Sequence, residues 1–323
     1  PNVHFVYRHQ VDFQASKDYD HLILDPESKP MDLAHDNEVV ICLATHVDDS
    51  LVGAVDETMF RWFRNRVSRD MKITHETSVS KFVGLDITIQ GDSLFVSAKT
   101  KIELLYAKWS ELFTDDDWKR SVNGTPFYLN KHPDDNAFLD TPVVTLVGDD
   151  EPYVDKELRR KYLSLVMAMY WICLHAEPSI MGVINMLSRK SHVVTEKLFS
   201  YAKYLLRYLY EMREKNIVEY RRDLPDGAKF IDETDFPEEE RIHNRFHICG
   251  YTDADYGIGP SRHCAVFMIA GGPYDWKSSM ITTVSPSTLD AEMKALFEGV
   301  LTAAWTKLFM DDFGHSILGP VDV

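Results

Sequence analysis

The sequence predicts an α+β fold: a small sheet with helices, then a helical connection, then a partial α/β domain. Apolar runs of strand length alternate with short amphipathic helices over residues 39–110. Helical periodicity then dominates from Val154 to about Asn216, and three strand-length runs followed by one long helix occupy 246–309. At 323 residues the chain is long for one compact domain, so two or three domains are expected.

The first region follows the order ββαββα. Two apolar runs at 39–45 and 50–55, separated by a polar tip, predict a hairpin. Residues 57–71 place apolar side chains four positions apart, which predicts an amphipathic helix that packs on one face of a small sheet. Runs at 82–89 and 93–98 predict two more strands joined by a turn, and KTKIELLYAKW predicts a short helix after them.

The rest of the chain alternates between loops and regular structure. Residues 114–154 keep neither helical nor strand periodicity, which predicts a long connection. Three packed helices are expected next, in KYLSLVMAMYWICLHA, PSIMGVINMLSR and TEKLFSYAKYLLRYLYEMREK, followed by an acidic, Pro-containing linker at 221–245. FHICGYTDADYG, HCAVFMIAGG and PYDWKSSM predict a three-stranded meander. Ser287 or Thr288 can cap a helix that runs through Phe309, and ILGPVDV is expected to begin a fourth strand.

The charge of the chain limits its partners. A formal net charge of −16 opposes nucleic-acid binding, because such binding draws most of its affinity from Lys and Arg that neutralise phosphates. The segments 131–160 and 223–240 each hold eight acidic residues, and both are expected to be loops or linkers. Without them the chain is nearly balanced, so local basic faces are compatible with its composition.

The sequence indicates neither a membrane span nor a redox or zinc centre. It has no apolar run of the length needed to cross a bilayer, and PNVHFVYRHQ has no basic region followed by an apolar one, so a soluble, unexported protein is expected. The cysteines lie far apart with no C-x-x-C pair, and we expect buried reduced thiols. They are Cys42, Cys173, Cys249 and Cys264.

Adjacent carboxylates stand at the tip of the first hairpin, in the sequence His46, Val47, Asp48 and Asp49. Polymerases need such a pair at a tight turn, because it helps to hold two magnesium ions that activate the primer hydroxyl. Asp-Asp is also common in ordinary β-turns, since Asp accepts local backbone hydrogen bonds. The residues alone leave both interpretations open.

A second pair of carboxylates belongs to the final segment. Asp253 lies on its first strand and Glu292 in the first turn of its helix, and a three-stranded meander can bring these two points together. Such a pair could bridge metal ions that activate water for phosphodiester cleavage. Asp255, on the same strand face as Asp253, and Asp290, just before Glu292, are lower-ranked alternatives. The ordinary interpretation is an exposed strand Asp and a helix-start Glu favoured by the macrodipole.

Several segments resemble, in order and spacing, the Pol polyprotein of copia-type LTR retrotransposons. The segments that resemble the palm of its reverse transcriptase are THVDDSLVGA followed by a helix, FVGLDITI, SAKTKIELL and GTP. Those that resemble its helical connection are YLSLVMAMYWICLHAEPSI, NMLSR and YAKYLLRYL. Those that resemble its ribonuclease H domain are GYTDADYG, GGPYDWKS and STLDAEMKAL. The resemblance covers roughly residues 39–323. It implies a partial reverse-transcriptase palm at 1–130, an acidic loop plus a helical thumb or connection at 131–220, a linker at 221–245, and a partial ribonuclease H-like domain at 246–323.

The resemblance also implies the site residues. Asp48 and Asp49 match the metal-binding pair of the polymerase, and Asp253 and Glu292 match the first two carboxylates of ribonuclease H. All four would be catalytic and would bind Mg²⁺ or Mn²⁺. His46 takes the family's tyrosine position, and the family's third polymerase aspartate lies upstream of this sequence. Both sites are therefore expected to be incomplete in this chain.

The implied function is that of a retroelement-derived RNA-directed DNA polymerase and ribonuclease H fragment. It would perform two-metal phosphoryl transfer on RNA template, DNA primer and RNA–DNA hybrid, inside cells in a cytoplasmic virus-like particle, with no membrane partner. One alternative is a decayed or repurposed retrotransposon remnant that acts as a structural or binding module without catalysis. Another is an unrelated acidic binding protein. The sequence does not decide whether the chain is catalytically active or what its oligomeric state is.

Basic and aromatic residues have two interpretations each. Trp276 and Lys277 match the family's Trp-Lys-Ser, but they also fit a core aromatic and a strand-edge charge. Lys203, Arg207 and Arg213 lie on the last long helix of the connection, where the resemblance implies proximity to template and primer. A solvated helix face explains these three residues equally well.

Overall fold

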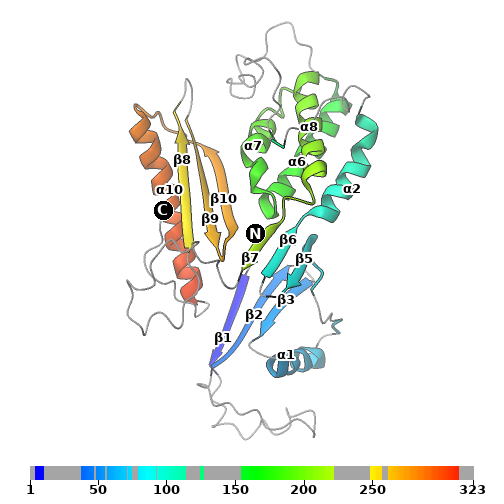
Figure 1. Cartoon of the computed structure of the whole chain (residues 1–323), viewed down its shortest axis with the longest axis vertical. Coiled ribbons are helices and arrows are strands. Elements are labelled where there is room, and N and C mark those ends of the chain that lie inside the picture. The colour runs from blue at the N-terminus through cyan, green and yellow to red at the C-terminus, as the bar shows by residue number, and fades with distance from the viewer. Residues whose placement is uncertain are drawn as a thin grey trace, which may run out of the picture. The chain divides into compact units, whose positions relative to one another are not determined.

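The computed structural model has an α+β architecture, with six α-helices and three small antiparallel sheets among the residues it describes (Figure 1). This confirms the predicted α+β class. The chain divides into a smaller compact unit, residues 1–83 with 309–315, and a larger one, residues 84–308 with 316–323. The structure describes residues 4–10, 38–46, 49–54, 57–70, 72–74, 79–91, 93–113, 124–126, 154–221, 248–256 and 261–312.

The smaller unit contains the predicted hairpin and its helix. Strand β2 (Glu38–His46) pairs antiparallel with β3 (Asp49–Ala54), and α1 (Glu57–Asp70) contacts both strands, as the apolar runs and the helical period predicted. Strand β1 (His4–Gln10), which the sequence did not predict, pairs with β2 along its whole length and gives the order β1-β2-β3. A two-residue strand, β4 (Lys81–Phe82), follows.

A turn interrupts the run that was predicted as one strand at 82–89. Val83 and Gly84 have φ angles of 52° and 80°, whereas strands need negative φ, so β4 ends here and β5 (Leu85–Gln90) begins after it. A β-branched residue such as valine rarely adopts positive φ. The prediction of one continuous strand was therefore wrong, because the alternation of apolar residues does not reveal this turn.

The larger unit begins with a sheet and a capped helix. β5 pairs with β6 (Ser93–Ser97), and β6 pairs with β7 (Val218–Arg221), which the sequence did not predict. The predicted short helix is α2 (Lys99–Trp109), where the Asp86 carboxylate accepts the N–H and the hydroxyl of Thr100, both at 2.7 Å. The next helical elements are η2 (Ser110–Leu112), α6 (Lys156–His175), η3 (Pro178–Ile180), α7 (Met181–Arg189) and α8 (Glu196–Met212).

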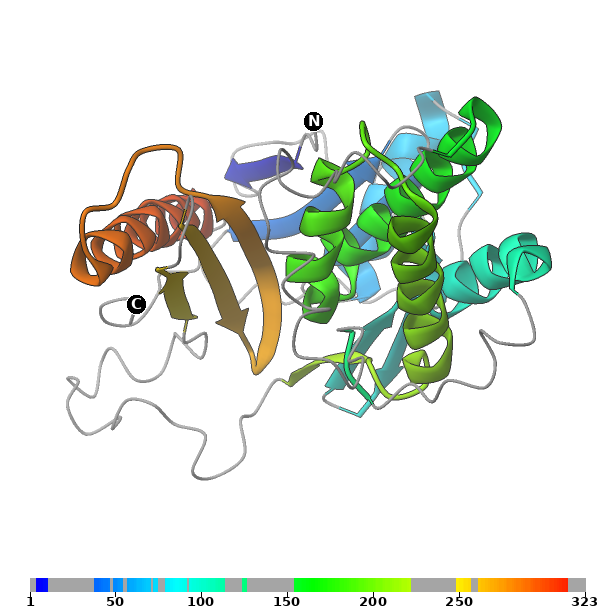
Figure 2. The ribbon, with the colours of Figure 1, turned by 90° about the horizontal axis from the view of Figure 1, so that it is seen from above.

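Packing of α6, α7 and α8 forms the main core and confirms the three predicted helices (Figure 2). Side-chain caps define where two of them begin: Asp155 accepts the N–H of Leu158 at 2.7 Å, and Thr195 accepts the N–H of Leu198 at 3.2 Å. The core side chains of these elements with essentially no exposed surface include Tyr162, Leu165, Met169, Ile172, Ile180, Ile184, Leu187, Leu198, Leu205, Leu206 and Leu209.

The predicted meander and the helix after it are also present in the larger unit. Strands β8 (Ile248–Asp255), β9 (Arg262–Ile269) and β10 (Gly272–Met280) form an antiparallel sheet in the order β8-β9-β10. The helix α10 (Thr288–Asp312) lies along this sheet (Figures 1 and 2). The predicted strand boundaries differ from these by only one to three residues, since glycine-bearing or charged breaks mark most of them.

Small residues mediate the packing of α10 on the sheet. Ser287 caps the helix by accepting the N–H of Asp290 at 3.2 Å, as the sequence allowed. The core between helix and sheet consists of Ala254, Ile281, Ala291 and Ala295. Large apolar side chains of α10 are exposed instead: Leu289, Met293, Phe297, Val300, Leu301, Trp305 and Leu308. The helix therefore presents much of its apolar surface away from the sheet.

Strand β7 approaches the start of β10 closely. A Cβ atom at Gly272 would lie 2.7 Å from the carbonyl oxygen of Glu219, so a larger residue would push the two backbones apart. The hydroxyl of Tyr220 donates to the carbonyl of Pro273 at 2.7 Å. These contacts tie the β5-β6-β7 sheet to the β8-β9-β10 sheet.

Some predicted features lie outside the described residues. They are most of the connection at 114–154, the linker at 221–245 beyond its first residue, and the strand expected in ILGPVDV. The domain boundaries placed in these segments stay predictions. None of the described helices is both long and apolar enough to cross a membrane.

We expect Leu205→Ala to lower the free energy of unfolding by about 2–5 kcal/mol, because Leu205 is fully buried and truncation leaves a cavity. Leu104→Ala is the matched control, since Leu104 lies on a helix but is 64% exposed, and it should change stability by less than about 0.5 kcal/mol. Urea denaturation followed by circular dichroism measures both values. Equal losses in the two variants would contradict the core assignment.

Candidate functional site

The hairpin tip is only partly covered by the described residues. Asp48 lies outside them, so its part in the predicted polymerase pair is untested. Asp49 starts β3 directly opposite His46, and both residues are exposed. Next to them, the hydroxyls of Thr45 and Ser50 lie 3.1 Å apart and close the end of the hairpin. The Asp49 carboxylate is thus open to solvent at the end of a well-paired hairpin.

Strand β8 presents two carboxylates on one face of its sheet. Asp253 lies opposite Cys264 and Asp255 lies opposite Arg262 on β9, and both aspartates are exposed. The Asp255 carboxylate accepts the backbone N–H of Arg262 at 2.6 Å. Asp255 therefore holds the open end of the β8–β9 pair together, which is an ordinary structural role. Asp253 is the more available carboxylate of the two.

The first turn of α10 supplies two more carboxylates. Asp290 forms an ion pair of 2.6 Å with Lys294, and its hydrogen bond to that ammonium group holds the pKa of Asp290 below its ordinary value. Glu292 is half-buried. Because Lys294 engages Asp290, Glu292 stays the preferred candidate of the two.

The thiol of Cys264 lies within the electrostatic influence of three of these carboxylates. Partial burial raises the pKa of this thiol, and the negative charges of Asp253, Asp255 and Glu292 raise it further, in decreasing order. The carboxylates from β8 and from α10 therefore both lie near enough to Cys264 to act on its thiol electrostatically. The raised pKa keeps the thiol neutral, so Cys264 does not compete as a thiolate ligand.

Strand alternation limits how closely Asp253 and Glu292 can meet. Ala254 belongs to the core beneath α10, so its neighbours on β8 point to the opposite face of the sheet. Glu292 can approach Asp253 only past the edge strand β8. Among the described residues, no three His, Cys, Asp or Glu side chains gather closely enough to hold a metal ion.

The carboxylates of Asp253 and Glu292 can be compared with the ligands that Mg²⁺, the metal implied by the resemblance, usually takes. Mg²⁺ is usually bound by one or two carboxylates together with waters and substrate phosphates, rather than by an all-protein cage. Asp253 and Glu292 supply carboxylate oxygens of the kind that Mg²⁺ prefers. Their chemistry suits a site that the substrate completes.

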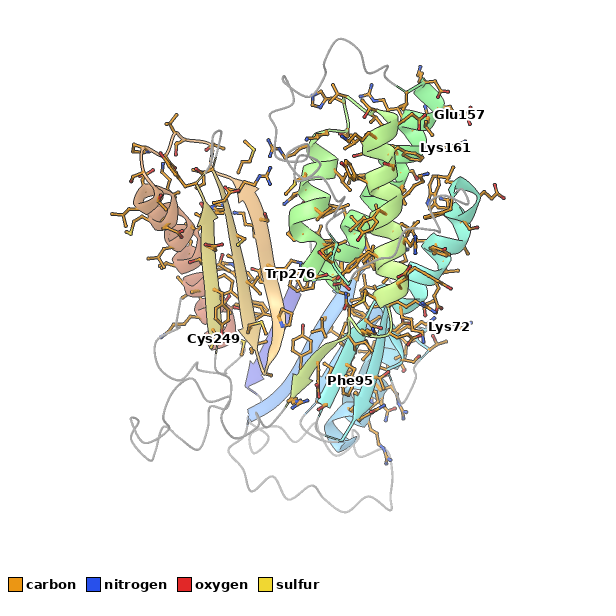
Figure 3. All side chains as sticks on the ribbon, turned by 45° about the horizontal axis from the view of Figure 1, so that its top comes forward. Lys72, Phe95, Glu157, Lys161, Cys249 and Trp276 are labelled. Carbon is orange, nitrogen blue, oxygen red and sulfur yellow. The ribbon has the colours of Figure 1, made fainter. Side chains whose placement is uncertain are left out.

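Trp276 and Lys277 have structural partners. The indole Nε1 of Trp276 donates to the carbonyl of Cys173 on α6 at 2.8 Å, and its ring packs against the helical core (Figure 3). Lys277 forms an ion pair of 3.0 Å with Glu298 of α10. The two residues are thus a partly buried aromatic and a strand charge, as one of the two interpretations expected.

The cations of α8 interact within the chain. Arg207 is buried and forms an ion pair of 2.7 Å with Glu211, so the interpretation of a solvated face was wrong for this residue. An arginine can be buried in this way because its stem is apolar and its guanidinium group stays paired. Arg213 pairs with Glu103 at 3.0 Å, and Lys203 donates to the Leu112 carbonyl at 3.4 Å.

The cysteines confirm and correct the expected burial. Cys173 and Cys249 are buried thiols, as predicted, but Cys264 is exposed, because β9 places it on the carboxylate-bearing face. The side chain of Cys42 lies outside the described residues. Sequence reasoning missed the relation of Cys264 to Asp253, because it depends on the strand register. One indication of this relation was present in the sequence: HCAVFMI and TDAD belong to consecutive strands of the predicted meander.

Glu177 is a buried carboxylate that sequence reasoning did not single out. It is 4% exposed and accepts hydrogen bonds from Ser179 and from Asn216, the latter at 3.1 Å. Burial raises its pKa, and these hydrogen bonds offset part of the rise. The network connects the start of η3 with the end of α8, so its role is structural.

No protein-family model matches the chain, and no solved structure matches it.

We expect the stability of the fold to depend on pH through Glu177. Its pKa is raised in the folded state, so its contribution is complete below the ordinary glutamate pKa of about 4.3 and is lost as the pH rises through the raised value. Glu177→Gln keeps the acceptor oxygen and removes the charge. The variant should gain stability relative to the wild type as the pH rises from 4 to 8, measured by urea denaturation.

The neighbouring Cys173 thiol does not confound this measurement, because burial raises its pKa to about 12. Identical pH profiles of the wild type and Glu177→Gln would show that Glu177 does not titrate as its burial requires.

Proposed function

We propose that the chain is the C-terminal part of a copia-type Pol polyprotein, combining an RNA-directed DNA polymerase palm fragment with a ribonuclease H-like segment. The observation that carries the ribonuclease part is the placement of the two carboxylates: Asp253 lies on the first strand of a meander, and Glu292 lies in the first turn of the helix after it. The motif order gives independent support, since the segments that resemble the family occur in the family's order.

The proposed substrate of the final segment is an RNA–DNA hybrid. Asp253 and Glu292 would hold Mg²⁺ or Mn²⁺, and the bound ions would activate water and neutralise the charge that develops at the phosphate. The exposed position of Asp253 leaves room for a phosphodiester strand.

A second candidate is a retrotransposon remnant that binds without catalysis. Two observations favour it: strand alternation turns Asp253 away from α10, and no group of three metal ligands occurs among the described side chains. This candidate predicts a folded chain with no cleavage activity in any variant.

We expect Asp253→Asn and Glu292→Gln each to reduce Mg²⁺-dependent cleavage of a labelled RNA–DNA hybrid by more than about 100-fold. Loss of an outer-shell partner of a metal site already costs about 10–100-fold, and loss of a ligand costs more. Glu196→Gln is the control, since Glu196 is likewise a glutamate in the first turn of a helix, and it should retain full activity. Equal cleavage by all variants would refute the ribonuclease site, and no cleavage by the wild type would favour the remnant.

For the polymerase part, we expect Asp49→Asn to abolish any RNA-templated primer extension, because the hairpin carboxylates would hold the catalytic ions. Ser50→Ala, at the next residue of the same hairpin, is the control that keeps the charge. Extension by Asp49→Asn at the wild-type rate would remove Asp49 from the proposed site.

A further inference from the structure

A basic cavity of about 390 Å³ lies in the larger unit between α7 and the strands β9 and β10. Its volume is in the range of about 300–1,000 Å³ that is usual for small-molecule sites. Tyr170 of α6 forms part of its wall. The polar residues that line it are Asn185, Arg189, Arg262, Lys277, Ser278 and Ser279.

The two sides of the cavity are fixed to each other. Asn185 of α7 donates from its side-chain amide to the carbonyl of Ser278 on β10. Arg189 lies four residues after Asn185 and therefore on the same face of α7. Arg262 starts β9, opposite Met280 of β10. One guanidinium group thus comes from the helix and the other from the sheet.

The charged side chains that line the cavity are all basic, although the chain carries a net charge of −16, and Gly182, Met186 and Met280 complete the lining. None of the side chains that line it is acidic. Partial burial lowers the pKa of Arg189, and the positive charge of Arg262 lowers it further, so the two guanidinium groups are close enough to repel each other. Lys277 contributes less, because Glu298 pairs with it at 3.0 Å. An anion between the two arginines would remove this repulsion.

We propose that the cavity binds the phosphate group of a nucleotide between Arg189 and Arg262, with the base against Tyr170. Guanidinium groups bind phosphate through paired N–H donors, the serine hydroxyls are further donors, and an aromatic ring accepts a base of any sequence by stacking. The phosphate can belong to a free mononucleotide or to a nucleic-acid strand.

The position of the cavity on the sheet is compatible with the binding of a nucleic-acid strand. Cys264 of β9 pairs with Asp253 of β8 on one side and with Ser278 of β10 on the other, so the three residues lie on the same face of the sheet. Neighbouring strands are about 4.8 Å apart, so β10 lies about 10 Å from β8. A nucleic-acid strand that follows this face could reach both the cavity and Asp253. The binding proposal does not require cleavage at Asp253.

Isothermal titration calorimetry of the full chain tests the proposal with three probes: inorganic phosphate, dAMP and a short single-stranded oligodeoxynucleotide. Arg189→Gln should weaken binding of the phosphate-bearing probes about tenfold or more, because a charge-assisted hydrogen-bond pair is lost. Arg160→Gln is the control, since Arg160 is an exposed arginine on α6 outside the cavity, and it should bind as the wild type does. Arg189 is preferred to Arg262, which also interacts elsewhere in the chain.

The probes distinguish the two sources of phosphate. If dAMP shows the Arg189 effect and the oligonucleotide does not, the ligand is a free nucleotide. If the oligonucleotide shows it and its affinity falls steeply with salt, the ligand is a strand. Equal affinities of Arg189→Gln and Arg160→Gln, or no binding of any probe to the wild type, would overturn the proposal.

Discussion

The hydrogen bond from the Trp276 indole to the Cys173 carbonyl, 2.8 Å long, joins the meander sheet to the helical core. Cys173 is fully buried in the last turn of α6, so this acceptor has a fixed position. Asn185 makes a second link from α7 to β10. Together they set where β10 lies, and β10 in turn sets the position of β9, Cys264 and the basic cavity. The candidate sites of the larger unit thus depend on how a sheet strand is anchored to the helices.

Local periodicity predicted the elements but not their long-range pairing. The helix α8 and the hairpin of β2 and β3 follow from patterns in neighbouring residues, and both were predicted correctly. Strand β7 has four residues and pairs with β6, more than a hundred positions earlier in the chain, so no local pattern announces it. The turn at Val83 and Gly84 was missed because its backbone conformation contradicts the preference of valine.

The candidate site shows the same division. The positions of Asp253 on a strand and Glu292 in a first helical turn followed from the sequence. The face on which Asp253 lies followed only from the register of β8 with β9 and from the packing of Ala254 beneath α10. Arg189 and Arg262 carry no motif, and they come together because α7 packs on β10. Sites that arise from packing between elements cannot be found from residue spacing.

The outward apolar surface of α10 has a practical consequence for work with this protein. Phe297, Leu301 and Leu308 are each more than half exposed on one helix, and soluble monomers rarely expose large contiguous apolar patches. Fluorescent dyes that report unfolding do so by binding exposed apolar surface. The native chain already offers them such a surface, so a high dye signal at low temperature would not indicate a molten or misfolded preparation. Near-ultraviolet circular dichroism, which reports fixed packing around aromatic residues, is the sounder criterion of its native state.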